Sequence, residues 1–208
     1  FLITGGGAMH LNDAITRNKN IKSHFLHHEQ ALTMAAEGYY RSCKKAAIVN
    51  VTTGPGAINA LNGVFGAFVD SIPMFVISGQ VKTSTMLCES NNNLRQLGDQ
   101  EVNIFKMVKP LVKYIATPNN LSEAITALKR ATFYLNNGRP GPVWLDIPID
   151  LQSTNINTED AEKIFGNAKG NRIYDYVHPN TLNNKNLNKG KIRSDINNLI
   201  KLIEKSKR

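Results

Sequence analysis

The stretch IVNVTTGPGAINALNGVFGAF, residues 48–68, holds a strand, a tight turn and a helix in immediate succession. The strand is apolar and β-branched and ends in the threonines at 52 and 53. The GPG triplet 54–56 makes the turn, and apolar residues then recur at helical spacing. A strand that enters a helix through such a turn is typical of an open α/β sheet, where ligands bind at the carboxyl ends of the strands.

The rest of residues 1–150 repeats this alternation of short β-branched runs and longer segments of helical period. Strands are predicted at residues 1–4, 23–26, 46–52, 74–78, 112–116 and 143–147. Helices are predicted at residues 8–17, 29–41, 57–69 and 121–135, the last with Asn119-Asn120 as its N-cap and Asn137-Gly138 at its end. We therefore expect an α/β fold with an open parallel sheet of about six strands and helices on both faces.

The composition changes after residue 152. Residues 153–192 are rich in Asn, Lys, Thr and Gly and show no period, whereas 194–207 suits a short amphipathic helix. We therefore expect one domain at 1–152, and at 153–208 a linker with the first helix of a further, absent domain. Because the chain opens inside a predicted strand without an initiator Met, we also expect a piece of a longer protein, slightly truncated at the N-terminus of its first domain.

Composition limits the class of protein. With 41% hydrophobic and 20% charged residues in 208, the chain has enough apolar residues for a packed core, which excludes general disorder. The net charge is +9, and the Asn/Lys-rich segment from residue 151 onward contributes +5 of it. No nucleic-acid-binding motif is present, so we interpret the excess charge as a solvated surface. No signal peptide or membrane span is predicted. Cys43 and Cys88 lack CxxC or histidine neighbours, which favours a reduced, cytoplasmic setting.

A second glycine-rich turn, Gly5-Gly6-Gly7, follows the first predicted strand. His10 stands where a dinucleotide-binding fingerprint needs glycine, and no Gly-Lys-Ser/Thr segment follows, so neither phosphate-binding motif is present. Two glycine-rich turns at the carboxyl ends of neighbouring strands would form a crevice for a ligand. Glu29 falls where the predicted strand 23–26 passes into a helix, so we expect its carboxylate in this crevice. The surrounding HHEQ is not the HExxH of zinc proteases, and we predict no metal site in this chain.

Four segments of the chain together resemble a known family. They are GGGAMHLNDAI (5–15), HHEQALTMAAEGYYR (27–41), VTTGPGAINALNGVFGAFVDSIPMFVISGQV (51–81) and RPGPVWLDIPIDLQ (139–152). In this order they resemble the N-terminal pyrimidine-binding (PYR) domain of thiamine-diphosphate-dependent enzymes, most of all the acetolactate synthase group. The resemblance covers about residues 1–152 and implies the PYR fold.

The resemblance also implies roles for individual residues. In this family a glutamate that matches Glu29 hydrogen-bonds N1′ of the cofactor's aminopyrimidine and so promotes loss of the thiazolium C2 proton. A carboxylic acid suits this task because it can share a proton with a weakly basic ring nitrogen. Pro55 and Asn59 match residues at the pyrimidine end of the cofactor. Gly6 and Gln100 match residues that line the substrate site.

Cofactors and partners follow from the same resemblance. It implies thiamine diphosphate as cofactor, Mg²⁺ held by a C-terminal domain that this chain lacks, and FAD in some full-length members. It implies a small 2-keto acid substrate, a homodimer or homotetramer in the full-length form, and neither nucleic acid nor membrane as partner. We therefore expect the chain on its own to be inactive.

Three hypotheses about function remain. The first is an acetolactate synthase-like carboligase or decarboxylase acting on pyruvate or a related 2-keto acid. The second is transfer of a pyruvate-derived acetyl group to a keto-sugar nucleotide or another polar acceptor, because Asp99 replaces the family's Phe and the preceding loop 83–98 is longer. The third is a non-catalytic binding protein with the PYR fold, against which the retained Glu29 argues.

Overall fold

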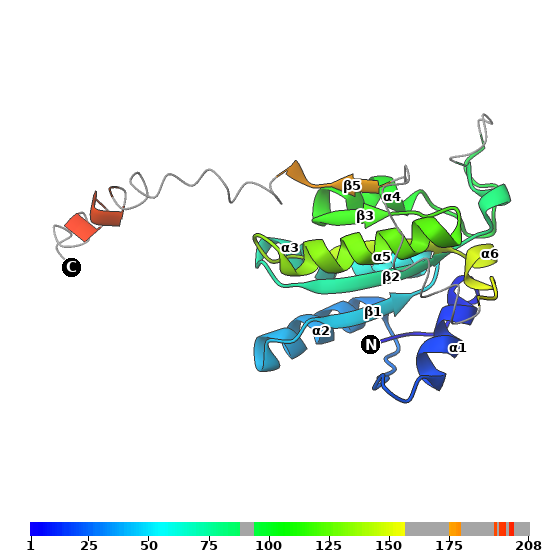
Figure 1. The fold of residues 1–208 in the computed structure, drawn as a ribbon, viewed down its shortest axis with the longest axis horizontal. Helices are drawn as coiled ribbons and strands as arrows, with labels where there is room; N and C mark the ends of the chain where they lie inside the picture. The colour runs from blue at the N-terminus through cyan, green and yellow to red at the C-terminus, as the bar shows by residue number, and fades with distance from the viewer. Residues whose placement is uncertain (88–93, 157–174, 180–193, 195, 199, 202–208) are drawn as a thin grey trace.

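The computed structural model describes residues 1–87, 94–156 and 175–179, together with 194, 196–198, 200 and 201. One sheet with the strand order β1-β2-β4-β3-β5 forms its centre (Figure 1). The strands are β1 (Ala47–Val51), β2 (Met74–Gln80), β3 (Tyr114–Ala116), β4 (Val143–Pro148) and β5 (Asp175–Val177). The first four strands pair in parallel, so their carboxyl ends lie at one edge of the sheet.

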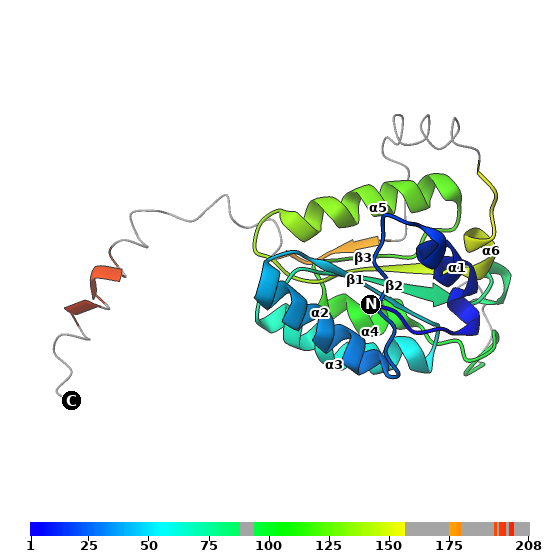
Figure 2. The ribbon, with the colours of Figure 1, turned by 90° about the horizontal axis from the view of Figure 1, so that it is seen from below.

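Helices cover both faces of this sheet, as the sequence predicts. Figure 2 shows α5 on one face and α2, α3 and α4 on the other. The α-helices are α1 (Met9–Arg17), α2 (Glu29–Cys43), α3 (Pro55–Val69), α4 (Ile104–Val108), α5 (Leu121–Asn136) and α6 (Ile149–Gln152). Short 3-10 helices are η1 (Gly6–Ala8), η2 (Thr83–Thr85) and η4 (Lys109–Leu111).

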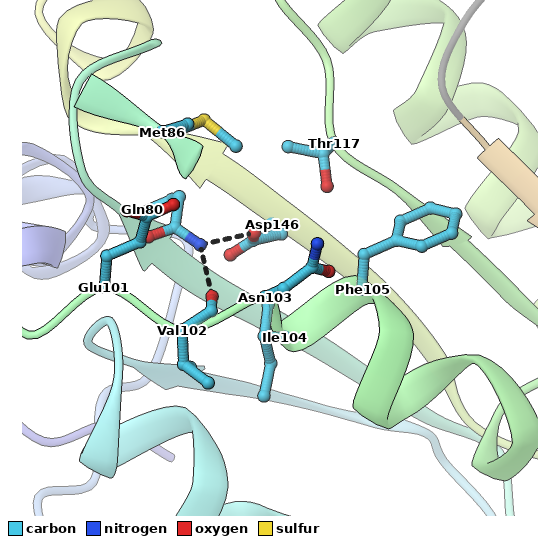
Figure 3. A pocket seen from close by; sticks show the side chains of 9 residues that line it. All are labelled: Gln80, Met86, Glu101, Val102, Asn103, Ile104, Phe105, Thr117 and Asp146. Carbon is cyan, nitrogen blue, oxygen red and sulfur yellow. Dashed lines mark hydrogen bonds between the residues drawn. The ribbon is translucent and has the colours of Figure 1, made fainter. Parts of the chain in front are cut away.

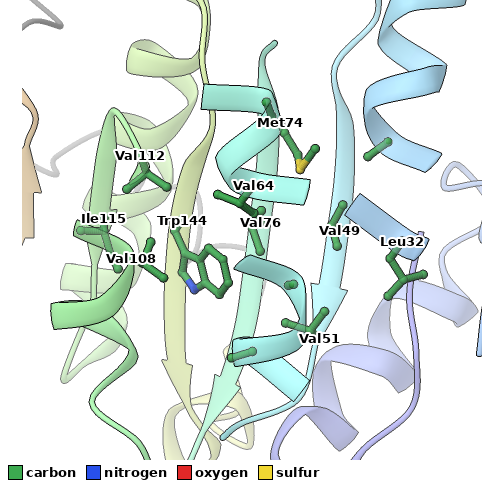
Figure 4. Close-up of a cluster of buried hydrophobic side chains, with 14 of the residues drawn as sticks. Leu32, Val49, Val51, Val64, Met74, Val76, Val108, Val112, Ile115 and Trp144 are labelled. Atoms are coloured by element: carbon green, nitrogen blue, oxygen red, sulfur yellow. The ribbon is translucent and has the colours of Figure 1, made fainter. Parts of the chain in front are cut away.

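The core has two layers, one on each face of the sheet. Under α2, α3 and α4, Trp144 of β4 packs in a cluster with Val76 of β2 and Val49 of β1, all fully buried (Figure 4). Under α5, a smaller cluster includes Tyr114 and Leu145. Because β4 is covered on both faces, its sequence VWLDIP is nearly all apolar rather than alternating.

Two of the six predicted strands do not form strands in the structure. Residues 1–4 and 23–26 are reduced to isolated bridges, in which Leu2 pairs with Phe25 and with Asn50. Leu2 is nevertheless 2% exposed, and its backbone N–H donates to the carbonyl of His24. The apolar pattern therefore identified buried extended chain, but the stretches are too short to form a ladder. The other four predicted strands are confirmed within three residues at their ends.

Strand β5 was not predicted, because DYV lies in a segment without a clear period. Its pairing with β3 is antiparallel, and tertiary contacts hold it in place. Arg130 of α5 forms an ion pair of 2.5 Å with Asp175, and the Lys109 ammonium lies 4.5 Å from the ring centre of Tyr176. A three-residue strand that depends on such distant partners leaves little local signal.

Other sequence expectations concern the surface and the C-terminal segment. Cys43 is a free, exposed thiol, whereas Cys88 lies outside the described residues. No helix within the described ranges is both long and apolar enough to cross a bilayer. Of the helix expected at 194–207, the described residues 194, 196–198, 200 and 201 are helical.

Candidate functional site

The turn that follows β1 is held in a conformation that requires glycine. Gly54 has a φ of 58°, in the left-handed region that side chains rarely adopt. A Cβ atom at this position would lie 2.0 Å from the carbonyl oxygen of Gln100. The turn at residues 52–56 is therefore packed directly against the backbone of the loop that precedes α4.

The first glycine-rich turn contacts the same segment. The backbone N–H of Gly7 donates to Thr52 Oγ1 at 3.0 Å, and a Cβ on Gly5 would lie 2.4 Å from Thr52 Cβ. Gly6 differs, because a Cβ there would meet no atom within 4 Å. The two turns expected to meet at the carboxyl edge of the sheet are thus in contact. Gly5 and Gly7 are needed for this packing, while Gly6 faces open space.

Glu29 is the first residue of α2, and its carboxylate reaches the turn at 52–56. Glu29 Oε2 accepts a hydrogen bond from Asn59 Nδ2 of α3 at 3.1 Å. A Cβ on Gly56 would lie 3.1 Å from Glu29 Oε1, so the missing side chain of Gly56 makes room for the carboxylate. Glu29 is half-buried, and among the described residues no hydrogen bond reaches Oε1. The site therefore presents one oriented carboxylate oxygen with unused hydrogen-bonding capacity.

The other predicted site residues lie at the start of α3 and on the loop that contacts the turn at 52–56. Pro55 begins α3, one turn of helix before Asn59, and both side chains are exposed. Asn59 lies inside α3 and binds Glu29, so it does not cap the helix. Gln100 reaches the turn through its backbone and itself has a left-handed φ of 55°. Such backbone strain in a non-glycine residue is concentrated at functional sites.

A buried polar network behind the turn was not predicted from the sequence. Thr53 Oγ1 donates to Gln80 Oε1 at 2.7 Å, and Gln80 Nε2 donates to Asp146 Oδ2 at 2.9 Å. The second oxygen of Asp146 accepts from Ser78 at 2.6 Å. Figure 3 shows Gln80 and Asp146 facing each other beside a cavity of about 20 Å³. A usable signal was present, because polar residues inside the apolar strands MFVISGQ and VWLDIP need buried partners.

Asp146 is fully buried, and burial raises the pKa of its carboxyl group to about 7. The hydrogen bonds from Ser78 and Gln80 act in the opposite direction, and the nearby charge of Glu101 adds to the increase. Since the usual pKa of an aspartate is near 3.8, the carboxyl group holds its proton in the folded protein over a pH range in which the unfolded chain has lost it.

This difference predicts a pH-dependent stability. Between pH 3.8 and about 7, folding requires proton uptake by Asp146, so the free energy of unfolding should fall as the pH rises through this window. The full effect is up to about 4 kcal/mol. Replacement of Asp146 with Asn should flatten this part of the profile. Urea unfolding of both proteins from pH 4 to pH 8 measures it, and parallel profiles would contradict the assignment.

Metal-binding side chains do not gather at this site. No group of three or more His, Cys, Asp or Glu suited to a metal ion occurs among the residues that the structure describes. His27 and His28 stand next to Glu29 in the sequence, but the ring Nδ1 of His28 accepts from the backbone N–H of Gln30 at 3.1 Å and so caps α2.

Known proteins share this sequence pattern. Residues 1–107 match the family described as "Thiamine pyrophosphate enzyme, N-terminal TPP binding domain". The acetolactate synthase large subunit of Haemophilus influenzae is 36% identical over 152 residues, which cover 73% of this chain and 25% of that protein. The chloroplastic acetolactate synthase of Arabidopsis thaliana is 34% identical over 155 residues, which cover 73% of this chain and 22% of that protein.

The chain thus spans about a quarter of the length of the curated relatives that it matches. The family match includes both glycine-rich turns, Glu29, Asn59 and Gln100, and it extends over more than half of the chain. The chain belongs to the thiamine pyrophosphate enzymes and carries their N-terminal TPP binding domain.

Proposed function

We propose that this chain is the pyrimidine-binding domain of an acetolactate synthase-like, thiamine-diphosphate-dependent enzyme that acts on pyruvate or a related 2-keto acid. The observation that carries the proposal is the Glu29 carboxylate, held by Asn59 against the side-chain-free surface of Gly56. The family match and the similarity to acetolactate synthases support the class of reaction. The domain that binds Mg²⁺, and a domain that binds FAD in some members of the family, would belong to a longer protein.

The residues present fit the pyrimidine end of the cofactor. Glu29 is half-buried, and the missing side chain of Gly56 gives its Oε1 room at the turn. Pro55 and Asn59 stand at the same end of α3, where they would line the ring. When bound, thiamine diphosphate would supply a nucleophilic thiazolium carbon for reaction with the keto carbon of the substrate.

In this proposal, the chain exchanges a proton with the pyrimidine ring, away from the thiazolium carbon. Glu29 Oε1 would share a proton with ring atom N1′, and a carboxyl group is suited to this because it can both hold and release that proton. The hydrogen bond from Asn59 Nδ2 to Oε2 orients the carboxylate and would keep Oε1 directed at the ring. Gly6 and Gln100, on the adjoining turn and loop, would line the space for the substrate.

A partner subunit is also part of the proposal. The outer surface of α2 and α3 exposes Met34, Ile58 and Phe65, which are 48%, 39% and 53% accessible. Exposed apolar side chains on two neighbouring helices suit an interface with a second copy, so we propose a homodimer or homotetramer. A reducing compartment such as the cytoplasm suits the exposed thiol of Cys43.

A polar acceptor is the second candidate for the reaction. Asp99 is exposed and directly precedes Gln100, whose backbone contacts the 52–56 turn. A carboxylate next to Gln100 would favour a hydroxylated acceptor, such as a keto-sugar nucleotide, over a second molecule of pyruvate.

The test is an assay of the full-length protein with pyruvate and Mg²⁺, in the presence and absence of thiamine diphosphate. We expect pyruvate consumption that depends on the cofactor. Acetolactate as the product from pyruvate alone would exclude the polar acceptor. Pyruvate consumption only after addition of a keto-sugar nucleotide would favour the polar acceptor. A folded protein that neither binds the cofactor nor consumes pyruvate would contradict the proposal and point to a non-catalytic binding protein.

A further inference from the structure

The side chain of Gln80 joins segments that are far apart in the sequence. Gln80 is the last residue of β2 and is 2% exposed. Its Oε1 accepts from Thr53 Oγ1 at 2.7 Å and from the backbone N–H of Val81 at 2.9 Å. Its Nε2 donates to Asp146 Oδ2 at 2.9 Å and to the carbonyl oxygen of Val102 at 3.4 Å. Donors and acceptors of the amide are all matched, which fixes its orientation.

Two of these partners belong to the segments that form the candidate site. Thr53 precedes Gly54 in the turn at 52–56, and Val102 follows Gln100 by two residues. The backbones of Gly54 and Gln100 are in contact, with no space for a Cβ between them. Gln80 therefore ties both sides of this contact to the sheet, through Thr53 on one side and Val102 on the other. Figure 3 shows its hydrogen bond to Val102.

The opposite end of the network is anchored in the core. Ser78 Oγ donates to Asp146 Oδ1 at 2.6 Å and accepts from Trp144 Nε1 at 2.7 Å. Trp144 is fully buried, so this end cannot shift without repacking the core. The chain of hydrogen bonds runs from Trp144 through Ser78, Asp146 and Gln80 to Thr53.

We propose that Gln80 is a positioning residue that holds the turn at 52–56 against the loop carrying Gln100, and thereby sets the placement of Gly56 beside the Glu29 carboxylate. This inference rests on the proposed function for its catalytic meaning. Its structural content, a turn held by one amide, can be tested without cofactor. Gln80 does not touch Glu29, so its effect on the reaction passes through Thr53 and the turn.

The first test uses hydrogen–deuterium exchange of the full-length protein without cofactor. Replacement of Gln80 with Met keeps the length and apolar volume but removes four hydrogen bonds. We expect exchange in the peptide covering residues 52–59 to become about tenfold faster. The matched control is Ser78→Ala, which disturbs Asp146 from its other side and leaves Gln80 and Thr53 paired. It should lower the melting temperature without accelerating exchange at 52–59.

The second test addresses the reaction. In Q80M the thiamine diphosphate concentration for half-maximal activity should rise about tenfold, since the turn must be ordered on binding. Thr53→Val should shift the cofactor requirement in the same direction, and Thr53→Ser should behave nearly as the wild type. Q80M combined with Thr53→Val should be no worse than Q80M alone, since Gln80 has then already lost its bond to Thr53. Thr53→Val also provides the exchange test if Q80M does not fold.

The outcomes separate the two proposals. Equal exchange at 52–59 in Q80M and Ser78→Ala would show that Gln80 is only a core residue and would overturn the inference. Additive effects of Q80M and Thr53→Val on the cofactor requirement would also overturn it. A wild-type protein without thiamine-diphosphate-dependent turnover would overturn the proposed function, while the exchange comparison would still decide whether Gln80 holds the turn.

Discussion

Replacement of Glu29 with Gln in the full-length protein is expected to abolish thiamine-diphosphate-dependent turnover while leaving the fold intact. The amide has the same shape and can still accept from Asn59 Nδ2 at the position of Oε2. It has no proton that it can exchange with a ring nitrogen, so general acid–base assistance is lost. Such assistance contributes roughly 10²–10⁴-fold to a rate, which sets the expected decrease in kcat. Steady-state kinetics at saturating cofactor measures it.

The matched control is Glu37→Gln on the same helix. Glu37 pairs with Arg41 one turn further along α2, at 2.7 Å and near the surface, so its loss should change neither kcat nor folding appreciably. A Glu29→Gln protein with more than half of the wild-type activity would contradict the assigned role. A variant that loses its circular dichroism spectrum would show that Glu29 acts on stability instead.

Replacement of Gly54 with Ala is expected to destabilise the protein strongly. The alanine would need a φ of 58° and would place its Cβ 2.0 Å from the carbonyl oxygen of Gln100. Backbone strain alone costs about 1–3 kcal/mol, and displacement of the Gln100 loop adds to it. We expect a free energy of unfolding lower by about 3 kcal/mol or more, measured by urea denaturation.

Gly6→Ala is the comparison for this substitution. A Cβ on Gly6 meets no atom within 4 Å, so its effect on stability should stay within about 0.5 kcal/mol. Two glycines in adjoining turns would then differ strongly in a way that their sequence context does not reveal. Equal stability of the Gly54→Ala and Gly6→Ala proteins would mean that the loop at Gln100 can move away from the turn at little cost.

Much of the fold could be predicted because its elements depend on local patterns. The predicted helix at 121–135 is α5, and Asn120 caps it by accepting from the backbone N–H of Glu123 at 3.0 Å. The helices at 8–17, 29–41 and 57–69 are likewise present as α1, α2 and α3, with small differences at their ends. Apolar residues at helical spacing and cap residues are contained within a few residues of chain, so one sequence suffices to read them.

The parts that escaped prediction depend on distant partners. Helix α4 has only five residues, and strand β5 forms only where it pairs with β3. In the site, the proximity of Glu29 to the turn followed from the expected crevice, because both lie where extended chain passes into a helix. The hydrogen bonds of Gln80 and Asp146 behind the turn could not be predicted in this way, because these residues are 66 apart in the sequence and become neighbours only after the sheet has formed.

The order of the strands has a consequence for synthesis of the protein on the ribosome. β4 is the fourth strand to emerge, yet it lies between β2 and β3 in the finished sheet. Until residue 148 has left the exit tunnel, β2 keeps one edge unpaired and β3 has no parallel neighbour. Open edges of this kind recruit other chains, so prematurely terminated products should aggregate or be captured by chaperones rather than persist as smaller domains.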